Sequence, residues 1–194
     1  EITTGDWSSD VCSSDLPEVE FYGRPAHPVW EISLVDTGLR TEKASRISRV
    51  ASYIRAERFF VAYGDDVSDV NLTDLIRFHK AHGKMATITA VQTNLQYGVV
   101  EATDSGLVTG FSERPQLPYW INGGFMLFER EVLDLIGPGD DVNLETEILP
   151  RLAEQSQLMI YRHTGFWQSM NTMKDTMLLE EIWQKDPPWK VWED

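Results

Sequence analysis

The sequence has almost no cysteine and no long hydrophobic run. Cys12 is the single cysteine in 194 residues, which excludes a disulfide framework and disfavours thiol catalysis. No segment approaches the roughly eighteen consecutive apolar residues that a membrane-spanning helix needs. The first residues also lack the basic region and the apolar stretch of a secretion signal. We therefore expect a cytoplasmic protein that has no membrane partner.

Positive charge is also scarce. Lysine and arginine number 17 against 31 aspartate and glutamate residues, so the formal net charge is -14. A chain this acidic repels the phosphate backbone of nucleic acids and the surface of anionic membranes. We therefore expect no nucleic-acid partner, and a polyanionic nucleotide would need Mg2+ and a few well-placed cations to bind.

The composition is otherwise that of a folded protein, with 42% hydrophobic residues and seven tryptophans. The exception is the segment DWSSDVCSSDL at residues 6–16, which resembles the translation of a sequencing-library adapter joined in frame. The alternative is an ordinary loop rich in Ser and Asp. We treat residues 1–16 as a non-native segment and residues 17–194 as one domain, which then has no cysteine.

The middle of the chain has the pattern of an α/β fold. The apolar run FFVAYGDD, from Phe59, predicts a strand buried on both faces and stopped by a polar loop. Asn71 and Gly83 then offer the two caps of an amphipathic helix. A second strand, MATITAV, follows at 85–91. Together these segments predict a β-α-β unit of parallel type, with helices on both faces of the sheet.

Further elements follow. The runs beginning at Tyr97 and Leu107 predict a hairpin, 121–129 and 158–163 predict strands, and the helical run containing Pro150 should be interrupted or kinked there. A last amphipathic helix is expected from about 172 to 185. The side chains of this helix expected to face the protein are Met173, Met177, Leu178, Ile182 and Trp183.

Asp65, in YGDDVSD, is the first candidate for chemistry. Open α/β sheets bind ligands beyond the carboxyl ends of their strands, and a carboxylate there suits Mg2+ shared with phosphate oxygens. The alternative is that Asp65, Asp66 and Asp69 are solvated loop acids. His79 and His82 stand three residues apart on the predicted helix, but no third ligand is near in sequence. We expect them on an exposed helix face.

The order of several short motifs resembles the sugar-1-phosphate nucleotidyltransferase family, and FHKAHGK with GFWQ resembles its glucose-1-phosphate cytidylyltransferase branch. The motifs are LVDTG at 34–38, RISRV at 46–50, YGDDVSD, FSERP at 111–115, INGGF at 121–125 and GFWQSMNT at 165–172. The resemblance implies a three-layer, Rossmann-like nucleotide-diphospho-sugar transferase fold with a mixed, mostly parallel sheet. It also implies Mg2+, a nucleoside triphosphate, most simply CTP, a sugar 1-phosphate such as glucose 1-phosphate, and a homo-oligomer.

The resemblance assigns a role to particular residues. Asp65 matches the aspartate that holds Mg2+ between the nucleotide phosphates and the sugar phosphate. Other matching positions imply contacts with the sugar phosphate: Glu113, Arg114, Asn122, Gly123, Gly124, Tyr97, Gly98 and Arg46. The glycines could instead mark close packing or a bulge within a strand.

Two single residues and one short stretch depart from the family pattern. Arg114 replaces a lysine, and Asn171 replaces the second metal-binding aspartate, so one of two anionic ligands becomes a neutral amide. Asn171 is equally good as the N-cap of the helix that follows. KASR at 43–46 replaces TGGR, which adds side-chain bulk near the substrates. These departures leave open another sugar or base, or a noncatalytic relative that binds sugar phosphates or assembles with active subunits.

The family's Gly-rich GGxGTR loop, which grips the triphosphate through backbone N–H groups and an arginine, has no counterpart in residues 1–33. The resemblance implies that residues 17–194 are the C-terminal two-thirds of a single nucleotidyltransferase domain, truncated at its N-terminus, and that central strands of the sheet are missing with the loop. We therefore expect the 194-residue chain by itself to be inactive and poorly soluble.

Overall fold

A computed structural model of the chain describes residues 33–137, 139 and 141–191. The predicted non-native segment, residues 1–16, lies outside the described residues. The chain divides into two compact units: residues 1–55 with 133–150, and residues 56–132 with 151–194. The second unit holds the sheet.

In the first unit, a short helix, α1 (Lys43–Arg49), contacts η3 (Leu144–Ile148), and η1 (Ala51–Tyr53) follows α1. η3 is a π-helical turn that leads directly into α3 (Leu149–Glu154). Because Pro150 has no N–H, a widened turn just before it is a low-cost way to absorb the missing hydrogen bond. The predicted irregularity at Pro150 is confirmed.

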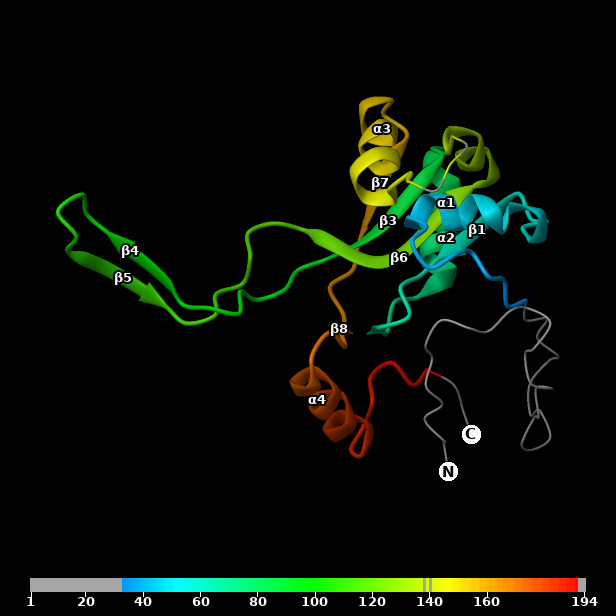
Figure 1. Ribbon diagram of the computed structural model, residues 1–194. Coiled ribbons are helices and arrows are strands. Elements are labelled where there is room, and N and C mark those ends of the chain that lie inside the picture. Colours follow the sequence, from blue (N-terminus) through cyan, green and yellow to red (C-terminus); the bar gives the residue numbers. More distant parts are fainter. Residues whose placement is uncertain (1–32, 138, 140, 192–194) are drawn as a thin grey trace. The chain divides into compact units, whose positions relative to one another are not determined.

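Within the described residues, the sheet of the second unit has four strands in the order β1-β6-β3-β7 (Figure 1). They are β1 (Arg58–Val61), β6 (Ile121–Glu129), β3 (Ala86–Val91) and β7 (Leu158–Arg162). β6 runs antiparallel to both neighbours, while β3 and β7 are parallel. Three strands therefore share one direction and β6 opposes them, which is the mixed sheet that was predicted.

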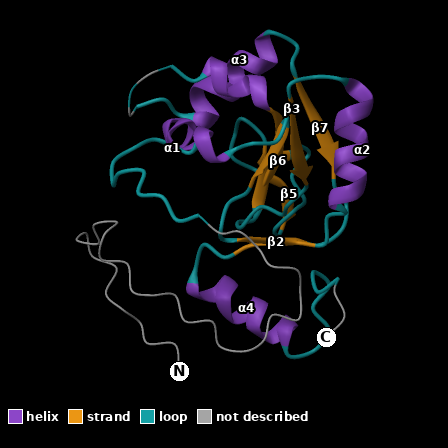
Figure 2. Ribbon diagram, turned by 90° about the vertical axis from the view of Figure 1, so that its right-hand side faces the viewer, coloured by secondary structure: helices purple, strands orange, loops and turns teal. Residues whose placement is uncertain are grey.

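Helix α2 (Leu72–His82) connects β1 to β3 and lies along one face of the sheet (Figure 2). Asn71 caps its first turn by accepting a 3.1 Å hydrogen bond from Asp74 N, and Gly83 ends it in the left-handed conformation at φ 62°. Both predicted caps are confirmed. The β-α-β unit is also present, although β6 lies between its two strands.

Burial is greatest at the centre of the sheet. All six residues of β3 are buried, so both of its faces are covered. β1, predicted to be buried on both faces, is instead an outer strand in which Phe60 is 39% exposed. The prediction was wrong because an apolar run does not reveal whether a strand has neighbours on both sides.

The prediction for the histidines of α2 was also wrong. His79 is fully buried; its Nδ1 lies 2.7 Å from Thr87 Oγ1 and its Nε2 lies 3.1 Å from Glu129 Oε1. Leu75, His79 and His82 follow each other at four- and three-residue spacing, so they share the face of the helix that packs on the sheet. His79 is therefore part of the core, and His82 lies half-buried beside it on the same face.

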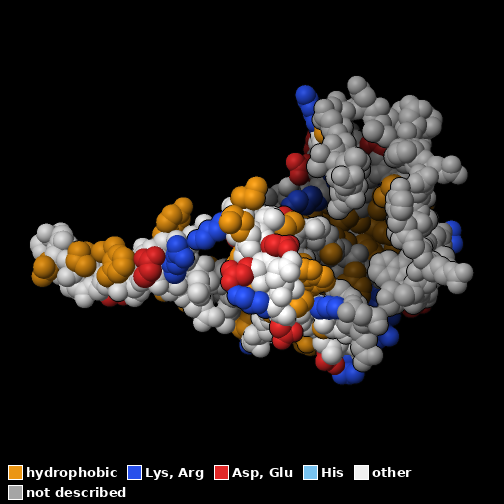
Figure 3. All heavy atoms as spheres, turned by 90° about the horizontal axis from the view of Figure 1, so that it is seen from below, with side chains coloured by type: hydrophobic (Ala, Val, Ile, Leu, Met, Phe, Trp, Pro, Cys, Tyr) orange, Lys and Arg blue, Asp and Glu red, His pale blue; other side chains and the backbone are white. Residues whose placement is uncertain are grey.

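The predicted hairpin forms from β4 (Val99–Ala102) and β5 (Val108–Ser112), which make a two-stranded sheet of their own. Gly106 N donates to Thr103 O across the turn. Figure 3 shows hydrophobic side chains along this hairpin. Two of the hairpin's apolar residues, Val100 and Phe111, are 55% and 65% exposed.

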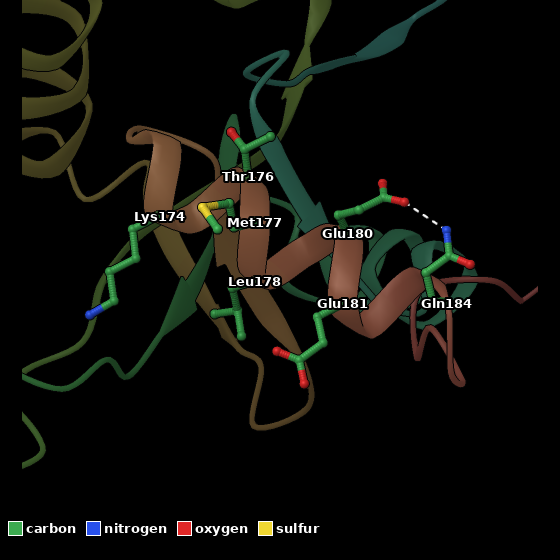
Figure 4. Close-up of a pocket in the computed structure, with 7 residues that line it drawn as sticks. All are labelled: Lys174, Thr176, Met177, Leu178, Glu180, Glu181 and Gln184. Carbon is green, nitrogen blue, oxygen red and sulfur yellow. Dashed lines mark hydrogen bonds between the residues drawn. The ribbon is translucent and has the colours of Figure 1, made fainter.

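Helix α4 (Met173–Trp183) forms as predicted, but the side chains that face the protein are not the ones that were predicted. Leu179 is its buried side chain, whereas Met173, Met177, Leu178 and Trp183 are exposed, so the expected inward face was wrong. A shallow hollow runs along the exposed side (Figure 4), where Gln184 Nε2 donates to Glu180 Oε1. This hollow is lined by α4 and the residue that follows it, and it contains none of the predicted site residues.

Among the described residues, no helix is both long enough and apolar enough to cross a membrane.

Candidate functional site

A short two-stranded sheet brings Asp65 beside the segment that holds Asn171. It is formed by β2 (Asp66–Ser68) and β8 (Trp167–Ser169), which pair antiparallel with Asp66 opposite Ser169. One step further, Met170 N donates a 2.7 Å hydrogen bond to Asp65 O. Two segments about one hundred residues apart in sequence therefore meet at this junction, which we call the β2–β8 junction.

Asn171 is not the cap of the helix that follows it. Thr172 caps α4 in a reciprocal capping box: Thr172 Oγ1 accepts from Asp175 N, and Asp175 Oδ2 accepts from Thr172 N. The side chain of Asn171 instead donates through Nδ2 to Ser169 Oγ at 2.9 Å. This bond leaves its Oδ1 as the atom that can accept a cation.

Asp66, which the sequence did not single out, has a carboxyl group with a perturbed pKa. Burial, and after it the charge of Asp65, raise the pKa of Asp66 from 3.8 to about 6. Asp65 itself is exposed. Burial therefore disfavours the charged form of Asp66, and a cation bound nearby would favour it.

These donors fit a divalent cation only in part. Among the residues described, no group of three His, Cys, Asp or Glu side chains is arranged to hold a metal. In phosphoryl-transfer sites Mg2+ is commonly held by one or two carboxylates together with phosphate oxygens and waters. The β2–β8 junction offers donors of these types in the carboxylates of Asp65 and Asp66 and the amide oxygen of Asn171.

We expect the raised pKa of Asp66 to appear as a pH dependence of stability. The folded pKa lies above the unfolded value, so the stabilising contribution is present at pH 4 and is lost as pH rises through 6. Asp66→Asn should therefore stabilise the chain by about 1 kcal/mol at pH 8, a value reduced for solvent screening, and by much less at pH 4. Urea unfolding at both pH values measures this; an equal effect at the two pH values would contradict it.

Asn122, Gly123 and Gly124 lie at the start of β6, next to this junction. Asn122 Nδ2 donates to Tyr63 Oη at 3.2 Å, and its Oδ1 accepts from Gly124 N at 3.0 Å. Trp167 Nε1 donates to Gly123 O at 2.9 Å. These bonds fasten β6 to β8 and to the loop that precedes β2.

Close packing leaves no room for a side chain at Gly123 or Gly124. A Cβ on Gly123 would lie 2.9 Å from Val91 Cγ1, and one on Gly124 would lie 2.3 Å from Asp66 Oδ2. Gly124 also has a φ of +88°, which L side chains rarely adopt. Close packing, left open as an alternative by the sequence, therefore accounts for these glycines whether or not a sugar contacts the backbone.

The other predicted sugar contacts lie along the hairpin. A Cβ on Gly98 would lie 3.0 Å from Glu113 Oε2, so these two residues are neighbours. Arg114 Nε is 3.5 Å from Glu113 Oε1, both side chains are exposed, and Arg114 has a positive φ of 47°. Tyr97 is 79% exposed. The structure thus groups these residues at the base of the hairpin and leaves their side chains accessible.

Arg46 belongs to the first unit, where its guanidinium organises a loop. It donates to Thr41 O at 2.7 Å, Thr37 Oγ1 at 2.9 Å and Leu39 O at 3.2 Å. Ala44 and Ser45, which replace the family's two glycines, are buried in α1. Their added bulk is therefore accommodated within the first unit.

Sequence reasoning also missed His163. Its Nε2 lies 2.9 Å from Asp69 Oδ1 and 3.1 Å from the carbonyl oxygen of Phe166, and its side chain is only 10% exposed. A Cβ on Gly165 would overlap the same carboxylate at 2.4 Å. No sequence signal links residues 69 and 163, because only the pairing of β2 with β8 brings them together.

A mixed sheet of this order, flanked by helices and carrying acidic residues beyond its first strand, defines an α/β nucleotide-diphospho-sugar transferase fold. HddC from Yersinia pseudotuberculosis superposes with a TM-score of 0.55 at 18% identity, covering 75% of this chain and 64% of that one. A putative glucose-1-phosphate thymidylyltransferase from Bacillus anthracis gives 0.53 at 14% identity, covering 73% and 61%. At such low identity these structures show the fold alone.

The chain belongs to the nucleotidyl transferase family, whose sequence profile matches residues 29–194. It is 42% identical over 167 residues to glucose-1-phosphate cytidylyltransferase of Salmonella typhi, covering 84% of this chain and 64% of that protein. It is 35% identical over 186 residues to a probable glucose-1-phosphate cytidylyltransferase of Bacillus subtilis, covering 95% and 72%. A mannose-1-phosphate guanyltransferase beta-A of Xenopus laevis is 38% identical over 144 residues, covering 69% and 40%. The chain thus spans somewhat less than two thirds of the length of the Salmonella relative.

Proposed function

We propose that the chain is part of an enzyme that transfers a nucleotidyl group from CTP to glucose 1-phosphate, with Mg2+ as cofactor. The observation that carries this is the β2–β8 junction, which sets Asp65 beside the segment that holds Asn171 in a chain 42% identical to a cytidylyltransferase. In this reaction a phosphate oxygen of the sugar phosphate attacks the α-phosphorus of the nucleotide. The bond from that phosphorus to the bridging oxygen breaks, and pyrophosphate leaves.

Each group at the junction has a part in this proposal. Asp65 is the exposed carboxylate that ligates the cation, and Asn171 offers Oδ1 beside it. Mg2+, when bound, supplies neutralisation of charge on the phosphate oxygens. Arg114 is the cation available to the sugar phosphate, through a fork suited to two phosphate oxygens. Most of the work is positioning and charge neutralisation, as expected for phosphoryl transfer.

A second candidate uses the same site with another sugar and base. It is favoured by the 38% identity to a mannose-1-phosphate guanyltransferase and by the changed residues at 43–46. We propose further that the whole protein is cytoplasmic and homo-oligomeric, supported by the acidic composition and by the exposed apolar side chains of α4.

Ligand binding to the 194-residue chain tests the proposal without requiring turnover. With Mn2+ in place of Mg2+, calorimetric titration should show glucose 1-phosphate binding at least tenfold more tightly than mannose 1-phosphate, because an ill-fitting hydroxyl leaves polar groups unpaired. The reverse order would favour the second candidate. If neither sugar phosphate bound, the proposal would be overturned; CTP is left out of the test because the loop expected to grip the triphosphate has no counterpart in residues 1–33.

A further inference from the structure

A small polar pocket lies beside the β2–β8 junction and holds none of the residues assigned so far. Its volume is about 100 Å3, and its polar lining residues are Gln92, Gln116, His163 and Thr164, with Trp167 as one wall. This space is comparable to that of a few water molecules. It is therefore suited to part of a small ligand and not to a whole nucleotide.

The two sides of the pocket come from different segments. One side is the base of the hairpin, where Asn94 bridges Gln116 and Leu117 N donates to Thr93 O at 2.9 Å. Gln92 is two residues before Asn94, so in an extended chain their side chains point to the same face. This arrangement brings the amides of Gln92 and Gln116 to one wall.

The other side is the segment between β7 and β8. His163 Nε2 hydrogen-bonds there to the carbonyl oxygen of Phe166, and Asp69 Oδ1 lies 2.9 Å from the same nitrogen. The Nδ1 of His163 has no hydrogen-bond partner within the described part of the chain. The same holds for the side chains of Gln92, Gln116 and Thr164. Four polar groups without protein partners thus converge on one small space.

The chemistry of these groups selects the kind of ligand. Amides, a hydroxyl and an imidazole both donate and accept hydrogen bonds, and none of the four carries a fixed charge. No lysine, arginine or carboxylate lines the pocket within the described residues, so it suits neither a phosphate nor a metal ion. Sugar hydroxyls, which also donate and accept, are the matching partners.

The position of the pocket points to the same ligand. Gln116 follows Arg114 by two residues, and Trp167 is tied to Gly123 O at 2.9 Å, so the pocket adjoins three segments proposed to bind the sugar phosphate. From Trp167, β8 leads to Met170, which bonds to Asp65, over three residues or about 10 Å of strand. A sugar placed here would hold its phosphate toward the junction.

We propose that this pocket binds ring hydroxyls of the hexose and so determines which sugar 1-phosphate the site accepts. The inference rests on the proposed function and names its specificity-determining residues: Gln92, Gln116, His163 and Thr164. Gln116 contacts a hydroxyl directly, and Asp69 positions His163.

The test is a comparison of glucose 1-phosphate with its 2-, 3-, 4- and 6-deoxy analogues by calorimetry, using the 194-residue chain with Mn2+. The wild-type chain should bind at least one analogue about fivefold more weakly than the parent sugar phosphate, the cost of one lost hydrogen bond. Gln116→Leu keeps the side-chain volume and removes the amide. It should bind the parent about fivefold more weakly and no longer distinguish that analogue. Gln155→Leu, an exposed glutamine outside the pocket, is the matched control.

The outcomes separate the two proposals. If Gln116→Leu binds the parent and every analogue as the wild-type chain does, the pocket inference is wrong and the proposed function stands. If the wild-type chain binds no glucose 1-phosphate, the proposed function is overturned and the pocket inference with it. Melting temperatures of both variants, expected to match wild type because the substituted side chains are exposed, show that the fold is intact.

Discussion

Replacing His79 with alanine is expected to lower the free energy of unfolding by about 3 to 4 kcal/mol. The substitution empties a fully buried site and leaves the hydroxyl of Thr87 and the carboxylate of Glu129 short of a partner. Urea denaturation followed by tryptophan fluorescence measures the change. Lys80→Ala, at the exposed next position of the same helix, is the control and should change stability by no more than about 0.5 kcal/mol.

The size of this effect follows from four linked hydrogen bonds in which the donor and the acceptor of each bond can be assigned. Lys84 N donates to His82 Nδ1 at 2.9 Å, so the proton of neutral His82 is on Nε2, which donates to Thr87 Oγ1 at 2.7 Å. Thr87 then donates to His79 Nδ1, and His79 Nε2 donates to Glu129. Removal of His79 therefore takes away the acceptor of the Thr87 hydroxyl and a donor to the Glu129 carboxylate.

The same arrangement sets the response to acid. Burial lowers the pKa of both His79 and His82 below 6.5, their ordinary value. As pH falls through 6.5 the unfolded chain takes up protons first, so stability declines toward acid pH. This decline should be shallower in His79→Ala. A loss below about 1 kcal/mol at pH 8, or an unchanged acid response, would contradict the role given to this network.

Gly124→Ala is the second substitution with a large expected effect, a loss of about 3 kcal/mol. The new Cβ would lie 2.3 Å from Asp66 Oδ2 and 2.8 Å from Tyr63 Cδ2, in a backbone conformation with φ +88°. Strain of that conformation accounts for about 1 kcal/mol, and displacement of the neighbouring groups accounts for the remainder. The same urea titration measures the loss, and displacement of Asp66 should also alter its pKa.

Two other glycines separate these causes. Gly83 has a φ of +62° and no atom within 4 Å of the position that a Cβ would take, so Gly83→Ala should cost about 1 kcal/mol through strain alone. Gly64 has neither a positive φ nor a nearby atom, and Gly64→Ala should be close to neutral. If Gly124→Ala cost no more than Gly83→Ala, the close approach of β6 to Asp66 would be disproved.

Local signals predicted the elements well because they act over a few residues. Asn71 and Gly83 define α2 through hydrogen bonds and a backbone conformation that involve only their neighbours. Apolar runs and turn residues likewise located β6 and the hairpin. The order of the strands could not be obtained this way, since β6 inserts between β1 and β3 although it follows both in sequence.

Burial was the least predictable property, because it depends on what packs against each element. The spacing of His79 with Leu75 indicated a shared helix face, but a polar side chain gives no sign that Thr87 and Glu129 will satisfy it. Met177 was predicted to face the protein and is exposed, because an apolar residue on an amphipathic helix does not reveal whether another element covers it.

The roles assigned to the site residues stay predictions. What the structure adds is that the β2–β8 pairing brings together the two segments, holding Asp65 and Asn171, that the motifs had indicated. The raised pKa of Asp66 and the contact of Asp69 with His163 depend on that pairing, and no spacing in the sequence encodes it. Thr172, and not Asn171, caps α4, so Asn171 Oδ1 is not used as a helix cap. The presence of a neutral amide instead of a carboxylate at residue 171 is therefore not explained by helix capping.

The most direct test of the central claim is titration of the 194-residue chain with Mn2+ in the presence of glucose 1-phosphate, followed by electron paramagnetic resonance. Asp65→Asn should weaken Mn2+ binding at least tenfold because it removes an anionic ligand, and Asn171→Asp should strengthen binding because it restores one. Lys174→Asn on α4, outside the β2–β8 junction, is the control and should change nothing. Equal Mn2+ affinities for the wild-type chain, Asp65→Asn and Asn171→Asp would contradict the assignment of this junction as the metal-binding and phosphate-binding site.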